Sequence, residues 1–415
     1  MTGKLCLAIA TALVLAWPLS AVVPTVKPEE VGFSSERLRR VTDLVQRHIA
    51  AGGTSGGVML VARHGRIAHF EAVGVEDLES RKPMQKDTIF RIMSMTKPIV
   101  SVSILMMMEE GKIRLTDPAS RFVPELKELK VAVAQAGGGA DAPFDMVPAA
   151  REITVRDLLT HTSGLVSGPI STREARKVAL TGRETLADYI PRLARVPLEF
   201  QPGTRWAYSP QAGFDVLARI VEITAGQPFD RFTRNRIFEP LAMKDTFFYP
   251  ADGNPRIVTR YDASPSGLQK GTNPGFMNGA YVSGGGGLMS TAEDYLQFAQ
   301  MLLNGGELAG KRLLSPASVE RMSAVIVPDT LPGRARGEGY GLGVRVFSDP
   351  VEFNTFLSKG TYGWSGAYGT RFWIDPKEKI VAVLMTQTPS QPLARDWDNA
   401  VMYALVGGGA VRGTN

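Results

Sequence analysis

The apolar positions of the chain follow two periods, one typical of helices and one typical of strands. Two short apolar runs, 58–63 and 66–73, are separated by a turn and predict a pair of strands. Residues 98–110 predict a long apolar helix. The stretch 34–50 predicts an amphipathic helix, because its apolar side chains recur at helical spacing, at Leu38, Val41, Val45 and Ile49.

The middle of the chain has a helical pattern, and strands return near its end. A capping box at Thr154–Asp157 opens a short helix, and a second box at Ser290–Glu293 opens a longer one. The Gly- and Ala-rich stretch 131–150 predicts a loop. Because 370–374 and 380–386 predict strands, we expect one sheet built from both chain ends, with a helical insertion. Further helices are predicted at 184–195, 212–225, 229–238 and 395–405.

The N-terminus has the pattern of a secretory signal. Lys4 precedes an apolar run, 5–17, and the small residues Ser20 and Ala21 follow. We therefore expect a signal peptide over 1–21 and a periplasmic or secreted location in a bacterium. The run is shorter than the roughly 20 residues of a membrane span, so no stable span is expected after cleavage.

Composition excludes several classes of site. Cys6 is the only cysteine and lies within the expected signal, so the mature chain would have no disulfide, thiolate metal site or cysteine nucleophile. The 4 histidines show no metal-binding spacing, and neither a metal nor another cofactor is expected. The 47 Lys and Arg residues are scattered, so the net charge of +6 does not indicate a nucleic-acid partner. No oligomeric state is predicted.

The segment Ser94-Met-Thr-Lys97 is the first candidate for chemistry, and it holds the only S-x-x-K of the chain. Residues three apart share a helix face, so the hydroxyl and the amine can meet. A serine becomes a nucleophile when a base takes its proton, and a buried lysine can take part in that step. By itself the motif is weak, since a capping serine beside a solvated lysine gives the same letters.

Five segments in order make the pattern specific. The segment Phe90–Lys97 resembles the nucleophile segment of class C β-lactamases, penicillin-binding DD-peptidases and, above all, family VIII carboxylesterases. Four other segments are similar to hallmarks of the same superfamily and follow in the expected order: Leu158–Leu165, Phe200–Ser209, Gly284–Asp294 and Gly363–Gly369. The resemblance covers roughly residues 27–410.

The resemblance implies a β-lactamase/transpeptidase-like fold of the α/β plus α class. An antiparallel sheet flanked by helices would be built from both chain ends. This α/β domain would be discontinuous, formed by 27–130 and 283–412. Residues 131–282 would form an inserted all-helical domain.

The resemblance also assigns roles to residues. Ser94 would be the nucleophile and Lys97 its partner, and Tyr208 would shuttle protons between serine, substrate and leaving group. The backbone N–H groups of Ser94 and Ala367 would bind the oxyanion. The segment that would contact substrate is Trp364, Ser365 and Gly366.

Three positions depart from the β-lactamase pattern. Pro210 stands where β-lactamases carry an asparagine, Trp364 stands where they carry Lys or His, and Ala367 offers no polar side chain. An aromatic residue at the second of these positions is similar to family VIII esterases. Each change removes a polar contact that a β-lactam or a peptide would use.

Two other patterns suggest hydrolase chemistry but are rejected. His161 could belong to a serine triad, but the resembling families use this helix end structurally. The G-x-S-x-G match around Ser55 follows a helix and precedes a strand, whereas a nucleophile elbow needs a strand, a turn and then a helix.

The sequence therefore predicts a serine carboxylesterase that hydrolyses short-chain carboxylic esters through an acyl-enzyme on Ser94, with a small-molecule ester as its partner. A β-lactamase, DD-peptidase or amidase on the same scaffold is the nearest alternative. A non-catalytic, penicillin-binding-like sensor is an alternative of another class. The complete set of Ser94, Lys97 and Tyr208 argues against the sensor.

Overall fold

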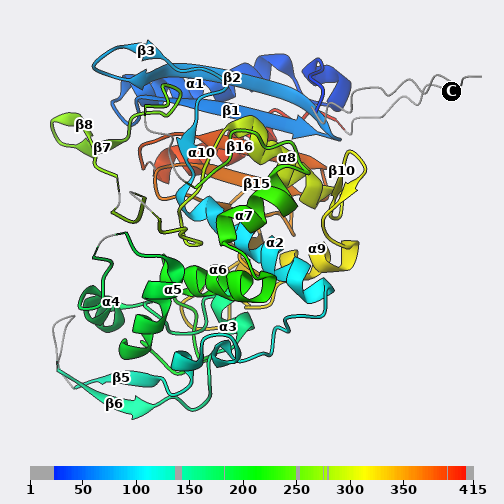
Figure 1. Ribbon diagram of the computed structural model, residues 1–415. Coiled ribbons are helices and arrows are strands. Elements are labelled where there is room, and N and C mark those ends of the chain that lie inside the picture. The colour runs from blue at the N-terminus through cyan, green and yellow to red at the C-terminus, as the bar shows by residue number, and fades with distance from the viewer. Residues whose placement is uncertain are drawn as a thin grey trace, which may run out of the picture.

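An eight-stranded antiparallel sheet forms the upper part of the molecule (Figure 1). The computed structural model describes residues 23–135, 143–181, 183–248, 253–273, 275–277, 280–389 and 391–407, and the expected signal segment lies outside them. The strand order is β12-β13-β14-β15-β16-β1-β2-β3. In chain order these strands are β1 (Gly56–Arg63), β2 (Arg66–Asp77), β3 (Lys82–Pro83), β12 (Glu338–Tyr340), β13 (Arg345–Phe347), β14 (Tyr362–Ser365), β15 (Arg371–Asp375) and β16 (Ile380–Met385).

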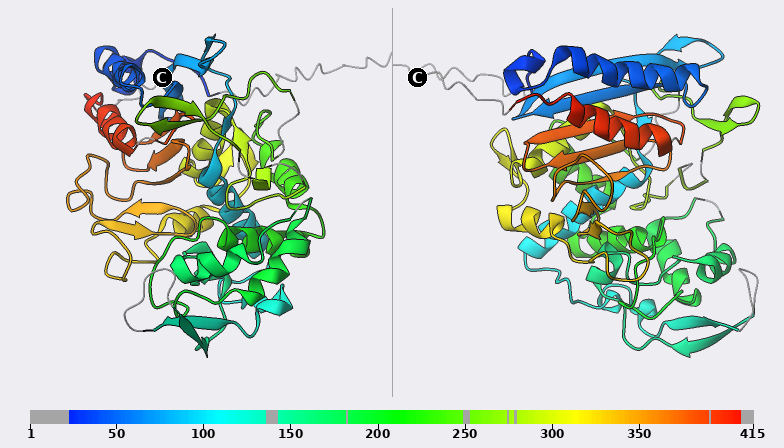
Figure 2. Two further views of the ribbon diagram at one scale, coloured as in Figure 1. Left: turned by 90° about the vertical axis from the view of Figure 1, so that its left-hand side faces the viewer. Right: turned by 180° about the vertical axis from the view of Figure 1, so that it is seen from behind.

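The sheet joins the two ends of the chain, as the hydrophobic pattern predicted. β1 pairs with β16 from Val58 opposite Met385 to Arg63 opposite Ile380. Side chains of β1 alternate between two cores, because successive residues of a strand point to opposite faces. On one face they meet α1 (Ser35–Ala50) and α10 (Gln391–Tyr403), which pack side by side (Figure 2). On the other face they meet the core that contains α8 (Ala292–Leu303).

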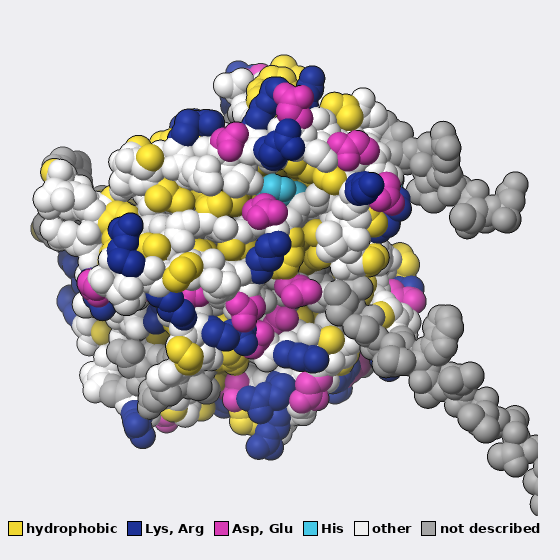
Figure 3. Space-filling model, turned by 90° about the horizontal axis from the view of Figure 1, so that it is seen from above, with side chains coloured by type: hydrophobic (Ala, Val, Ile, Leu, Met, Phe, Trp, Pro, Cys, Tyr) yellow, Lys and Arg dark blue, Asp and Glu magenta, His cyan; other side chains and the backbone are white. Residues whose placement is uncertain are grey.

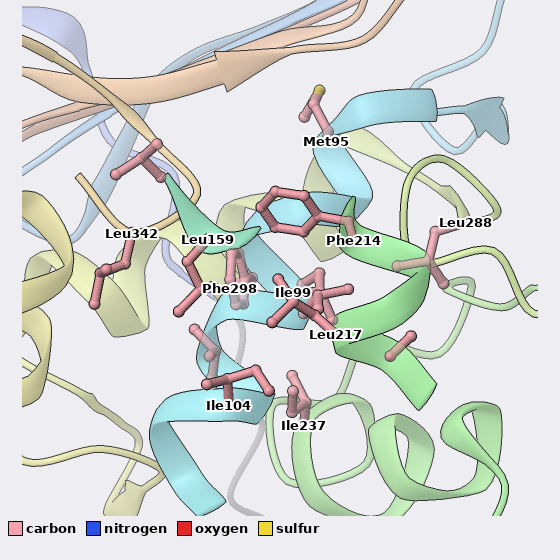
Figure 4. Packing of buried hydrophobic residues seen from close by; sticks show 14 of the residues in the cluster. Met95, Ile99, Ile104, Leu159, Phe214, Leu217, Ile237, Leu288, Phe298 and Leu342 are labelled. Carbon is pink, nitrogen blue, oxygen red and sulfur yellow. The ribbon is translucent and has the colours of Figure 1, made fainter. Parts of the chain in front are cut away.

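The helix α2 (Thr96–Glu109) runs through the middle of the molecule and is buried on all sides. Every residue from Thr96 to Met107 is buried, as expected for a helix that is apolar all round. In Figure 4, Ile99 and Ile104 of this helix pack among Leu217 and Phe298, which come from two other helices. The helix starts two residues earlier than the predicted 98, so Lys97 lies in its first turn and inside the core.

The segment between the two halves of the sheet contains most of the remaining helices. These are α3 (Val155–Leu159), α4 (Pro169–Arg176), α5 (Leu186–Tyr189), α6 (Ala212–Ala225) and α7 (Phe229–Thr233). The loop predicted at 131–150 is wrong: β5 (Lys130–Ala134) and β6 (Phe144–Pro148) form a hairpin there. A second hairpin, β7 (Tyr261–Ser264) with β8 (Gly267–Lys270), lies in the stretch that was expected to be entirely helical.

The remaining elements are short. The helix α9 (Pro316–Ser323) and the strand pairs β4 (Phe90–Arg91) with β9 (Met289–Ser290) and β10 (Glu307–Leu308) with β11 (Lys311–Arg312) connect the larger ones. Single helical turns cover Pro28–Val31, Met93–Met95, Ala119–Arg121, Pro124–Leu126, Ile190–Arg195, Arg234–Phe238 and Gly275–Met277.

Basic and acidic side chains are interspersed on the face seen from above (Figure 3). A hollow of about 540 Å³ between α1 and β2 is lined by both signs of charge, including Arg39, Asp43, Glu71 and Lys86. In the part of the chain that the structure describes, no helix is both long and apolar enough to cross a bilayer.

Candidate active site

The turn Met93–Met95 places Ser94 between strand β14 of the sheet and the central helix α2. The strand β4 leads into this turn and is held by β9, while the Ile92 N–H donates to the Leu288 carbonyl at 3.1 Å. Met93 has a φ of 48°, an unusual value for a residue with a side chain. Met93 and Met95 are buried, whereas Ser94 is partly exposed. The hydroxyl of Ser94 therefore sits at the start of a rigid helix and remains accessible.

Lys97 is fully buried, and all three of its N–H groups have an acceptor. Its Nζ donates to the Ser94 hydroxyl at 3.2 Å and to the carbonyls of Pro210 and Gly285 at 2.7 Å each. A buried ammonium is costly unless it is fully hydrogen-bonded, and an ammonium has three donors to satisfy. The site thus holds a fixed cation next to the Ser94 oxygen.

Tyr208 contacts the same oxygen, so that Ser94, Lys97 and Tyr208 form a triangle of side chains. Its hydroxyl donates to Ser94 Oγ at 2.7 Å, and Lys97 Nζ lies 5.0 Å from the centre of its ring. The structure therefore brings together the three residues that were predicted from motifs lying 114 positions apart. A proton can pass between Ser94 and Tyr208 along one short hydrogen bond beside a cation.

His161 is near this triangle but does not contact its hydroxyl groups. Its Nδ1 accepts the backbone N–H of Ser209 at 3.2 Å, and its Nε2 is buried with no hydrogen-bond partner among the described residues. Burial, together with the charges of Lys97 and Arg334, holds the pKa of His161 well below its ordinary value. The imidazole is therefore neutral, and the geometry gives no support to a Ser-His triad.

The strand β14, which lies between β13 and β15 in the sheet, forms the opposite wall of the site, and its residues point alternately to two faces. The Trp364 ring lies 5.6 Å from the Tyr208 ring, so it faces the triangle. Ser365 does not: its hydroxyl accepts a hydrogen bond from Arg371 at 3.1 Å, on the other face of the sheet. The side chain of Ser365 therefore supports the strand from behind, unlike the substrate contact expected for it.

The turn after β14 is docked onto the residue that precedes the nucleophile turn. The Thr370 hydroxyl donates to the Ile92 carbonyl at 3.1 Å, and the Gly366 N–H donates to the Thr370 carbonyl at 2.7 Å. A Cβ on Gly366 would lie 2.3 Å from the Ile92 oxygen, so only glycine fits. Ala367 follows at the exposed tip of this turn, two residues beyond β14, and β14 itself packs against the Ser94 segment.

A buried carboxylate, Asp215, was missed at the sequence level. It accepts hydrogen bonds from the Tyr281 hydroxyl at 2.7 Å, the Ser283 hydroxyl at 2.9 Å and the Gly285 N–H at 2.9 Å. The carbonyl of that same Gly285 receives the Lys97 ammonium. A carboxylate among the apolar positions of a helix was the signal that could have found it. Asp215 thus fixes one of the three groups that hold Lys97.

Burial raises the pKa of Asp215 to about 6, against the opposing effects of its hydrogen bonds and of Lys97. A raised folded-state pKa means that the folded protein binds this proton more tightly than the unfolded chain, whose Asp pKa is about 3.9. The stabilising contribution is therefore present below about pH 3.9 and is lost as the pH rises through about 6.

The variant Asp215→Asn does not titrate at this position. We expect the difference in unfolding free energy between the variant and the wild type to shift by about 3 kcal/mol in favour of the variant as the pH rises from 4 to 7. Urea unfolding of both proteins at four pH values measures this change. Asp294, whose pKa burial also raises to about 6, is common to both proteins and cancels in the difference. A difference in unfolding free energy that stays constant with pH would contradict the prediction.

Among the described residues, no group of three or more His, Cys, Asp or Glu side chains is arranged to hold a metal ion. The groups that meet at the site are a serine hydroxyl, an ammonium and a phenol. Together they can support nucleophilic attack on a carbonyl carbon and the proton transfers that accompany it.

Comparison with known proteins identifies the family of the chain. A model of the family described as Beta-lactamase matches residues 41–405. The chain is 37% identical over 362 residues to Protein Rv1367c of Mycobacterium tuberculosis, a match that covers 81% of this chain and 86% of that protein. It is 32% identical over 360 residues to Esterase EstB of Burkholderia gladioli, covering 80% of this chain and 86% of the esterase.

A solved structure is similar over nearly the whole chain. EstCE1, described as a hydrolase with promiscuous acyltransferase activity, superposes with a TM-score of 0.74 at 28% sequence identity. The match covers 92% of this chain and 99% of EstCE1. The predicted fold class is confirmed by these matches and by the large antiparallel sheet.

Proposed function

Because the chain belongs to the β-lactamase family of serine hydrolases, we propose that it is a carboxylesterase that hydrolyses short-chain esters through an acyl-enzyme on Ser94. The observation that carries the proposal is the triangle in which Lys97 and Tyr208 both donate to Ser94 Oγ. The esterase EstB is among its relatives, which supports ester hydrolysis in particular. A periplasmic or secreted location is proposed on the N-terminal pattern alone.

In the proposed mechanism, Tyr208 removes the Ser94 proton with the help of the Lys97 ammonium. The cycle starts once Tyr208 has released its own proton to solvent, so that the hydrogen bond between the two oxygens then runs from Ser94 to Tyr208. The proton passes from Ser94 Oγ to the phenolate oxygen of Tyr208 as Oγ attacks the ester carbonyl, and the ammonium of Lys97 stabilises the negative charge on both oxygens. The carbonyl oxygen becomes an oxyanion and is bound by the backbone N–H groups of Ser94 and Ala367.

Breakdown of the tetrahedral intermediate completes the first half of the reaction. Tyr208 returns the proton to the departing alcohol oxygen, which leaves an ester between the acyl group and Ser94. A water molecule then attacks the acyl carbonyl, gives its proton to Tyr208 and releases the acid, and Ser94 recovers its proton. The enzyme ends in the state in which it began.

The surroundings of the triangle favour esters over β-lactams. The carbonyl of Pro210 is used by Lys97, and its ring offers no donor to a substrate amide. Trp364 presents an indole where a cation would hold a carboxylate. Arg345 lies 5.5 Å from that indole ring, but it is only partly exposed and is paired with Glu338. A site with these walls suits an apolar, uncharged acyl group, since a charged one would be left unpaired.

We expect kcat/KM on p-nitrophenyl butyrate to exceed that on nitrocefin by at least about a hundredfold, or about 2.7 kcal/mol in transition-state stabilisation. Acyl chains of about ten carbons or more should react poorly if the cleft is short. The measurement is side-by-side kinetics with both substrates and a D-alanyl peptide. Equal or higher efficiency on nitrocefin or the peptide would favour the β-lactamase or DD-peptidase alternative, and inactivity on all three would favour the sensor.

A further inference from the structure

The segment that carries Tyr208 is held on both sides by one residue, His161. The N–H of Ala207 donates to the His161 carbonyl at 3.1 Å, and the N–H of Ser209 donates to His161 Nδ1 at 3.2 Å. These are the two backbone neighbours of Tyr208. The His161 and Tyr208 rings are also in contact, with centroids 4.7 Å apart.

The backbone at His161 is fixed by the helix that precedes it. The helix α3 is fixed by its capping box and by a carboxylate, Asp157, that accepts two hydrogen bonds from Arg151 and one from Thr162. His161 follows this helix with a φ of 56° and is 1% exposed. Residues with a side chain rarely adopt this left-handed region, but His, Asn and Asp do so more often than others. The position therefore demands both a permissive backbone and a side-chain acceptor.

We propose that His161 is a positioning residue for the reaction, which clasps the backbone on both sides of Tyr208 and so sets the distance between its hydroxyl and Ser94. This inference rests on the proposed function, in which Tyr208 transfers the proton. One half of the clasp is a backbone carbonyl that no substitution removes. The other half is a nitrogen lone pair, which exists only while the imidazole is neutral.

The surroundings keep that lone pair available. Burial and the positive charges of Lys97 and Arg334 hold the pKa of His161 well below its ordinary value. A protonated Nδ1 would face the Ser209 N–H as a second donor and would open the clasp. His161 therefore acts as a fixed acceptor and takes no part in the proton transfer itself.

Three substitutions separate the acceptor from the backbone conformation. Asparagine can adopt the left-handed region and places an oxygen near the position of Nδ1. Leucine has the same branching and the same number of side-chain heavy atoms as asparagine but no acceptor, and glycine has no acceptor and no backbone strain. His161→Leu and His161→Gly should both lower kcat roughly 30-fold with little change in KM, because small misplacements of a reacting group are costly. His161→Asn should stay within about threefold of the wild type.

A matched control uses another histidine with the same backbone conformation. His64 lies in the turn between β1 and β2 with a φ of 52°. His64→Leu introduces the same strain away from the site, so its kcat should equal that of the wild type. Thermal unfolding of every variant shows whether the fold is intact, and glycine remains informative if the strained leucine variant does not fold.

The deciding experiment repeats the His161 substitutions in a Tyr208→Phe background, with p-nitrophenyl butyrate as substrate. If His161 acts through Tyr208, His161→Gly should lower kcat by less than about threefold there, against roughly 30-fold in the wild-type background. An equal loss in both backgrounds, or an asparagine variant as poor as the glycine one, would overturn the positioning role alone. A Tyr208→Phe variant with full activity would instead overturn the proposed mechanism, and the inference with it.

Discussion

Ser94→Ala should lower kcat/KM for p-nitrophenyl butyrate by at least about 10⁴-fold, or about 5.4 kcal/mol, while leaving the fold intact. The substitution removes one partly exposed hydroxyl and leaves the buried packing of Met93 and Met95 unchanged. Without Oγ no acyl-enzyme can form, so only the binding and polarisation of the carbonyl would remain. Steady-state kinetics and thermal unfolding measure the two parts of this expectation.

A buried serine of the neighbouring helix α2 serves as the control. Ser103 lies on α2, and its hydroxyl donates to the Ile99 carbonyl at 2.9 Å, so Ser103→Ala should keep full activity. A fluorophosphonate probe should label Ser94 in the wild type and nothing in Ser94→Ala. Labelling of Ser55 or Ser163, which are 2% and 1% exposed, would show that another residue is the nucleophile.

Tyr208→Phe is expected to lower kcat by about 10³-fold, or about 4.1 kcal/mol, with KM changed by no more than a few-fold. The ring remains packed against His161 and Trp364, and only the hydroxyl that donates to Ser94 at 2.7 Å is lost. Because that hydroxyl acts on the moving proton, its loss should appear in the chemical step and hardly in substrate binding.

The control for this change is another tyrosine of the same region. Tyr362 is buried on β14, two residues before Trp364, and Tyr362→Phe should leave kcat close to that of the wild type. Acylation rates measured by stopped flow would place the effect of Tyr208→Phe before or after the acyl-enzyme. Normal acylation and deacylation in the variant would rule out Tyr208 as the proton carrier.

Much of the fold follows from local patterns. The helix at 34–50 and the strands around residues 60, 70 and 383 were predicted because each buries a periodic set of apolar side chains against one layer. The hairpin of β5 and β6 was missed because its sequence is rich in Gly and Ala. The hairpin also depends on a contact with a segment that is distant in the sequence. The N–H of Leu198 donates to the Lys130 carbonyl, a contact between distant segments that no local pattern contains.

Only those parts of the site that are formed by side chains within a recognisable sequence motif could be predicted. The spacing of Ser94 and Lys97 was readable, and so was Tyr208 once the ordered motifs were recognised. The carbonyls of Pro210 and Gly285, which hold Lys97, have no sequence signature because every residue carries a carbonyl. The orientation of Ser365 depends on the register of β14 with β15, which the motif does not encode.

The pairing of β1 with β16 also governs when the site can exist during synthesis. Ser94 and Lys97 are made well before Trp364 and the turn of Ala367, which follow them much later in the chain. The strand that carries Trp364 joins the sheet through β15 and β16, so it has no fixed place until the chain end has docked onto β1. Such long-range pairing is slow compared with local helix formation. The nascent chain therefore carries its proposed nucleophile for some time without the Trp364 wall and the Ala367 turn that the proposed mechanism requires.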